Sequence, residues 1–72
     1  MSLHDQWYKQ LVEELAVAVH IAYCEEYKKQ TKRNYWTKGN YALLPEKVKD
    51  IDRKTIDVVI KTLRKKGLVQ YV

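Results

Sequence analysis

The chain has 72 residues, 46% of them hydrophobic, and a formal charge of +5 at pH 7. Its length and composition exclude several protein classes: there is no low-complexity tract, no apolar stretch of about 20 residues that could span a bilayer, and no second cysteine to pair with Cys24 in a disulfide. We therefore expect residues 1–72 to form a single cytoplasmic domain, with enough positive charge to attract an anionic partner without identifying one.

The first predicted element is a long helix, capped by Asp5 and ending near Lys29. At 100° per residue, one apolar face should form the core; its members are Tyr8, Leu11, Val12, Leu15, Val19, Ala22 and Tyr23. Val17, Ile21 and Cys24 project to the opposite side, so the middle of this helix is apolar all round. We expect the C-terminal tail or a second copy of the chain, in a homodimer, to cover that surplus face.

The next segment, Thr31–Asn40, is a polar linker that contains a turn at Lys38-Gly39-Asn40 and a weakly predicted strand over 34–42. Pro45 suits the first position of a short turn or helix in the LPE segment. Asp52 then resembles the N-cap of a final helix that runs through Lys66 and ends at Gly67. Its apolar stripe is Ile56, Val59, Ile60 and Leu63, and residues 68–72 are β-prone and expected to dock.

These elements predict a mainly α fold, in which a long N-terminal helix packs on a C-terminal helix through their apolar stripes. Small strands at 34–42 and 68–72 are side features of that prediction.

No sequence pattern indicates catalysis. The chain has no glycine-rich phosphate loop and no nucleophile elbow, and His4 and His20 lack further ligands at zinc-binding spacing. Cys24 lies one helical turn after His20, as a Cys–His nucleophile requires, but it projects with apolar residues and reads better as a small buried hydrophobe. We expect no enzymatic activity, no cofactor and no metal.

Two groups of side chains have binding chemistry. His20, Tyr23 and Tyr27 form a polar-aromatic stripe, which is otherwise a hydrogen-bonded histidine with two rim tyrosines. Arg53 lies at the border of the last apolar stripe, where the simpler interpretation is a surface ion pair with Asp50 or Glu46. Together, a cation, an imidazole and aromatic planes suit a planar anionic ligand.

The same residues resemble the ryanodine-receptor repeat domain. The segment HIAY at 20–23 is similar to the H-x-x-[YW] signature of that family, and YALLPEKVKDIDR at 41–53 is similar to its [YW]-x-x-L-P-E-x-x-K-x-x-[DN]-R. Further matches follow at Thr55-Ile56, at 61–63 and at Gly67-Leu68, so the resemblance covers about residues 15–72. It implies a helical interaction or ligand-binding module without enzymatic activity, and nucleotide-type ligands have been suggested for its prokaryotic members. The implied ligand-binding residues are His20, Tyr23, Tyr41, Asp52 and Arg53.

The rival hypothesis is a winged-helix DNA-binding regulator, with helices over 44–51 and 53–67. Four cations on the last helix would then contact phosphates; they are Lys54, Lys61, Arg64 and Lys65. Asp57 and Val58 occupy the presumed reading face, which favours the first hypothesis. The expected partner is a small anionic ligand or a protein, with nucleic acid as the alternative and no membrane.

Overall fold

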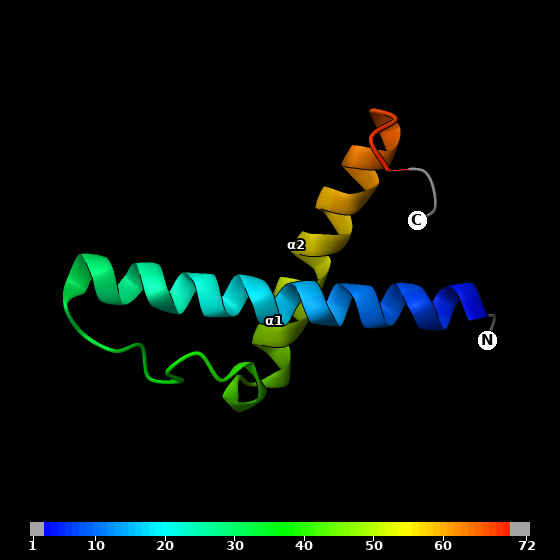
Figure 1. Ribbon diagram of the computed structural model, residues 1–72. Helices are drawn as coiled ribbons and strands as arrows, with labels where there is room; N and C mark the ends of the chain where they lie inside the picture. The colour runs from blue at the N-terminus through cyan, green and yellow to red at the C-terminus, as the bar shows by residue number, and fades with distance from the viewer. Residues whose placement is uncertain (1–2, 70–72) are drawn as a thin grey trace.

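The computed structural model describes the backbone of residues 3–69 and the side chains of residues 6–69. Two α-helices cross each other: α1 (Leu3–Thr31) and α2 (Glu46–Lys65), with a short 3-10 helix, η1 (Tyr41–Leu43), before α2 (Figure 1). The predicted mainly α fold, with a long N-terminal helix packed on a C-terminal one, is confirmed. The strand predicted over 34–42 is wrong, because that segment forms turns and η1; 68–69 are not a strand either, and 70–72 lie outside the described residues.

α1 begins at Leu3, two residues before the predicted cap Asp5, and continues two residues past the predicted end. It stops where Lys32 adopts a left-handed backbone conformation, φ 63°. The Thr31 hydroxyl helps to turn the chain, since it donates to the Tyr27 carbonyl at 2.7 Å and accepts from the Arg33 amide at 3.2 Å. The linker therefore reverses direction and runs back along α1 (Figure 1).

α2 starts directly after Pro45, which is its N-cap, and runs without interruption to Lys65. Asp52 consequently lies inside the helix, and its predicted role as N-cap is wrong: the proline, with its fixed φ, starts the helix upstream and nothing before Asp52 ends it. The predicted terminus at Gly67 is confirmed. Gly67 has a φ of 75°, its amide donates to the Arg64 carbonyl, and the Leu68 amide donates to Leu63, as in a Schellman motif.

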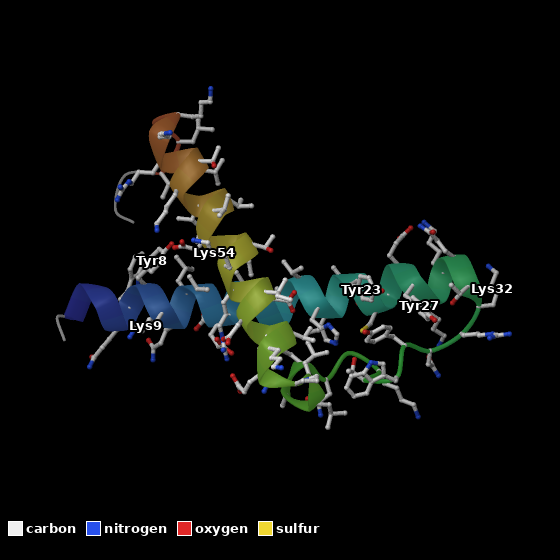
Figure 2. All side chains as sticks on the ribbon, turned by 180° about the vertical axis from the view of Figure 1, so that it is seen from behind. Tyr8, Lys9, Tyr23, Tyr27, Lys32 and Lys54 are labelled. Carbon is white, nitrogen blue, oxygen red and sulfur yellow. The ribbon has the colours of Figure 1, made fainter. Side chains whose placement is uncertain are left out.

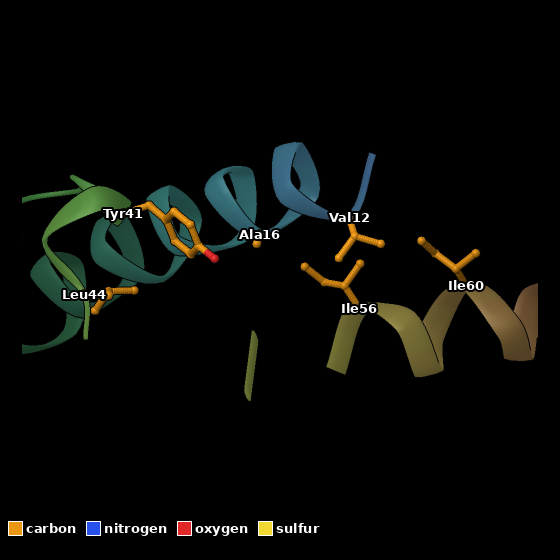
Figure 3. Packing of buried hydrophobic residues seen from close by; sticks show 6 residues of the cluster. All are labelled: Val12, Ala16, Tyr41, Leu44, Ile56 and Ile60. Atoms are coloured by element: carbon orange, nitrogen blue, oxygen red, sulfur yellow. The ribbon is translucent and has the colours of Figure 1, made fainter. Parts of the chain in front are cut away.

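The core lies where the two helices cross. Ala16 is completely buried there, and the small side chain allows the helices to approach closely. Around it pack the other members of the core, drawn in Figure 3: Val12, Tyr41, Leu44, Ile56 and Ile60. Neither helix, over the residues described, is long and apolar enough to cross a bilayer.

The buried stripe of α1 differs from the predicted one. Four residues spaced by four are buried: Val12, Ala16, His20 and Cys24. Leu15, Val19 and Tyr23, predicted in the core, are 36%, 53% and 51% exposed. Successive residues in this row of four-residue spacing are displaced by about 40° around the helix axis. A helix that crosses α1 obliquely can contact the whole row, although a projection down the helix axis assigns its members to different faces.

The predicted surplus face must also be corrected. Cys24 is buried by the chain's own linker, Val17 packs partly against the core, and only Ile21 remains exposed. On α2, Ile56 and Ile60 are buried as predicted, whereas Val59 and Leu63 are exposed. Leu68, expected to dock, is 71% exposed. Self-association remains a prediction.

Candidate functional site

The linker is held against α1 by Thr37, which is only 2% exposed. The hydroxyl Oγ1 of Thr37 shares a 2.6 Å hydrogen bond with Nε2 of His20, and Cys24 Sγ lies 3.5 Å from both atoms. The Gly39 amide donates to the same hydroxyl at 3.3 Å. The buried histidine is thus satisfied by a threonine that the sequence analysis did not single out, and this bond explains why His20 and Cys24 are covered.

Tyr35 is the centre of an aromatic cluster. It meets three rings of α1 edge to face, with centroid distances of 5.1 Å to Tyr23, 5.3 Å to Tyr27 and 5.8 Å to His20. Figure 2 shows Tyr23 and Tyr27 along the same part of α1. The predicted His20, Tyr23 and Tyr27 stripe therefore exists, and the linker supplies its fourth ring.

A hollow of about 200 Å³, which we call the His20 pocket, opens beside this cluster between α1, the linker and the start of α2. Its lining residues are Val19, His20, Tyr23, Tyr35, Leu44, Val48 and Asp52. Three of the five predicted ligand-binding residues, His20, Tyr23 and Asp52, are thereby brought together. Asp52 is the only carboxyl side chain among these lining residues, which include no lysine and no arginine.

Arg53, which we grouped with His20 as the cation of one ligand site, is not among the residues that line the His20 pocket. Its Nε and Nη2 donate to the two carboxylate oxygens of Glu13 at 2.8 and 3.1 Å. Its Nη1 donates to Asp50 at 2.7 Å and to Glu46 at 3.1 Å. We call Arg53, Glu13, Glu46 and Asp50 the Arg53 cluster. The simpler interpretation of Arg53, an ion pair with Asp50 or Glu46, is the one observed.

The charges of the Arg53 cluster stabilise each other. The hydrogen bond from Arg53 lowers the pKa of the Glu13 carboxyl below its ordinary value, despite the opposing effect of burial. The bonds to Glu13 and Glu46 in turn raise the pKa of Arg53. Because all three guanidinium nitrogens already have carboxylate partners, Arg53 has little capacity left for an anionic ligand.

Tyr41, the fifth predicted residue, lies in the core between these two regions. Its ring meets His20 at 6.2 Å, and Lys49 Nζ lies 5.6 Å from the ring centroid. Its hydroxyl is buried, and no hydrogen bond of ordinary length joins it to any of the described residues. Burial, followed by the negative charge of Glu13, raises the pKa of this phenol. Tyr41 contacts the His20 ring from the core and is not among the residues that line the pocket.

A larger hollow of about 600 Å³ lies on the opposite flank of the crossing. Its lining includes three carboxylates (Glu13, Asp50 and Asp57) and three cations (Lys9, Arg53 and Lys54). The Tyr8 hydroxyl donates to Asp57, which also pairs with Lys61 at 2.9 Å. These bonds lower the pKa of Asp57, while burial raises the pKa of Tyr8 to about 12. The balanced charge of this hollow gives it no preference for an ion of either sign.

The four cations of the rival hypothesis, Lys54, Lys61, Arg64 and Lys65, lie exposed around a hollow of about 410 Å³ on α2. The predicted turn between two helices is absent, since α2 is continuous through Asp52. Within the described residues, no group of three His, Cys, Asp or Glu side chains could hold a metal ion.

Comparisons with protein-family models, with curated proteins and with solved structures find no match to this chain.

Proposed function

We propose that this chain is a non-enzymatic binding module that holds a small ligand in the His20 pocket. The observation that carries the proposal is the convergence of His20, Tyr23 and Asp52, from two helices, around one hollow. An aromatic wall with one convergent charged group is typical of ligand sites. The resemblance to the ryanodine-receptor repeat domain, a binding module, agrees with this reading.

The chemistry of the pocket favours a small organic cation over the predicted anion. Asp52 supplies a carboxylate, and the faces of Tyr23 and Tyr35 attract a positive charge. Arg53, which was expected to hold an anionic group, is paired with three carboxylates instead. With about 200 Å³, the pocket is smaller than the roughly 300 Å³ at which drug-sized sites begin, so it suits a ligand smaller than a nucleotide.

A thermal-shift screen tests this proposal with choline and benzylamine as cations, and with benzoate and adenosine monophosphate as anions. A ligand at 100 times its dissociation constant adds about 2.7 kcal/mol to the free energy of unfolding. We expect a cation to raise the melting temperature, and Asp52→Asn or Tyr23→Ala to remove that increase.

Asp50→Asn is the matched control, because it removes a carboxylate of the same helix that does not line the His20 pocket. The ligand-induced shift should survive in this variant, even if its starting melting temperature is lower. A shift produced by benzoate and not by the cations, or one lost equally in both aspartate variants, would contradict the proposal.

DNA binding through the basic face of α2 is the weaker candidate. Lys61 is already paired with Asp57, and the continuous α2 lacks the turn that separates the supporting and reading helices of a helix-turn-helix protein.

A further inference from the structure

The end of α1 and the linker after it carry an excess of positive charge. Five cations occur in residues 25–38, namely Lys28, Lys29, Lys32, Arg33 and Lys38, against the two carboxylates Glu25 and Glu26. We call this segment the tip; its net charge of +3 is more than half of the chain's +5. All five cations are exposed, and none forms a salt bridge to any residue with a described side chain. The described side chains therefore supply no salt-bridge partner to these five cations, a pattern that suits a polyanionic partner.

The tip also exposes an aromatic surface. Trp36 is 58% exposed, and its ring lies 6.0 Å from that of Tyr35 at an angle of 37°. Tyr35 is held in place by its edge-to-face contacts with Tyr23 and Tyr27. The indole is thus presented to solvent on a cluster of packed rings.

The backbone around Trp36 is fixed by hydrogen bonds. Next to it, Thr37 is bound to the buried His20, and the Lys38 amide donates to the Tyr35 carbonyl at 2.9 Å. Lys32 and Lys38 adopt left-handed conformations at either end of the segment, with φ of 63° and 53°. Residues other than glycine rarely adopt the left-handed backbone conformation, so these two lysines indicate a specific path for the linker. Trp36 therefore needs little backbone ordering before a base can stack on its ring.

From this combination of unpaired cations and a supported, exposed indole, we propose that the tip binds single-stranded nucleic acid. Unpaired bases stack on aromatic rings while cations follow the phosphates, which is how sequence-tolerant single-strand binders work. A duplex hides its base faces and would leave Trp36 unused. The tip shares Tyr35 with the His20 pocket, but Trp36 and the five cations do not line that pocket. The two proposals can therefore fail independently.

The test follows Trp36 fluorescence in a Trp7→Phe background, which removes the chain's other tryptophan. The probes are oligothymidine and oligouridine of about ten nucleotides, a length within the usual site size. A DNA duplex of equal length and heparin, a polyanion without bases, are the comparison ligands. We expect fluorescence quenching and tighter binding with both single strands than with duplex or heparin.

Salt dependence and substitution separate charge from stacking. If all five cations contact phosphates, the logarithm of affinity should fall against the logarithm of salt concentration with a slope of about −3.5. Lys32→Ala with Arg33→Ala should reduce the size of that slope by about 1.4. Trp36→Ala, followed by anisotropy of a labelled strand, should weaken binding roughly 5- to 150-fold and leave the slope unchanged.

The matched control is Lys54→Ala with Lys65→Ala, which removes the same charge from α2. The proposal predicts that this double variant retains its affinity for single strands. Circular dichroism checks that every variant is folded. Equal loss in the two double variants would overturn it. Heparin binding as tightly as the single strands, or Trp36→Ala without effect, would overturn it as well, leaving a purely electrostatic surface.

Discussion

The Arg53 cluster and the tip are both rich in charged residues, but only the Arg53 cluster pairs its cation with carboxylates. In the Arg53 cluster, one cation meets three carboxylates drawn from α1 and α2, and every guanidinium nitrogen has a partner. In the tip, five cations stand without a salt bridge to the described side chains, beside an exposed indole. The number of charged residues in a region therefore does not by itself indicate a binding surface. What matters is whether the fold itself supplies the opposite charge.

The His20 pocket lies between these extremes. Its histidine is satisfied internally by Thr37, whereas the Asp52 carboxylate has no hydrogen bond or salt bridge to any described side chain. The polar groups used for architecture and those left for a ligand are therefore separated within one pocket. Substitutions and pH changes can test each part of this contrast separately.

The largest expected effect is that of Ile56→Ala, because Ile56 packs at the helix crossing on which both regions depend. Truncating a buried isoleucine costs about 2–5 kcal/mol of the free energy of unfolding. Urea unfolding followed by circular dichroism measures this loss. Val58→Ala on the exposed side of α2 is the control, expected to change stability by less than about 0.5 kcal/mol. Equal effects in the two variants would argue against the crossing as the core.

Thr37→Val should separate the aromatic region from the charged one. The substitution keeps the shape of the side chain but leaves His20 without its 2.6 Å partner, which costs about 1–3 kcal/mol. The near-ultraviolet circular dichroism of the surrounding rings should change at the same time. Thr55→Val is the matched control, since that hydroxyl only donates to a carbonyl of its own helix, on an exposed surface. An unchanged stability in Thr37→Val would mean that the linker is not held by this bond.

Acid should weaken the ion pairs and hydrogen bonds that Glu13 and Asp57 form across the helix crossing. The folded pKa values of Glu13 and Asp57 lie below their ordinary values of 4.5 and 3.8. Their contribution to stability is therefore complete above these ordinary values, and it is lost as the pH falls through the lowered, folded pKa values. Denaturant titrations between neutral pH and about pH 3 should show this loss, and Glu13→Gln should reduce it. A stability that rises on acidification would contradict the assigned ion pairs.

The smallest expected effect appears only in alkali. Tyr8 has a pKa of about 12, above its ordinary value of 10.0, so its contribution to stability is complete below pH 10 and is lost as the pH approaches 12. Absorbance of the phenolate should reveal a late-titrating tyrosine that disappears in Tyr8→Phe. If Tyr8→Phe leaves the late step intact, the high pKa belongs to another phenol, with Tyr41 the first to test.

Local sequence signals predicted some of these features correctly. Gly67 after three cations predicted the end of α2, because a left-handed terminus needs little beyond its own residues. The grouping of His20 with Tyr23 followed from helical spacing alone. Asp52 was misread as a cap because the same residue types occur inside a helix that a proline has already begun.

The long-range partners of Arg53 and Cys24 were not predicted, for a different reason. The decisive partner of Arg53 is Glu13, 40 positions earlier, and no local pattern relates the two. Cys24 is covered by Thr37 because the linker folds back along α1. That path requires left-handed backbone conformations at Lys32 and Lys38, two positions where no glycine indicates them. Contacts of this kind are set by how the helices cross, and the sequence pattern of one helix does not contain that angle.

The slender shape of the molecule, with extents of 41 × 27 × 15 Å, has a consequence for how it exchanges amide hydrogens. Two helices that touch mainly at one crossing share a single protected centre, so the slowest exchange should lie around Ala16 and Ile56 and become faster toward the helix ends. The tip lies at one of those fast ends. A single-stranded nucleic acid bound there would slow amide exchange over residues 28–38, where exchange is otherwise fast. Hydrogen exchange would therefore report binding at the tip without a fluorescent label.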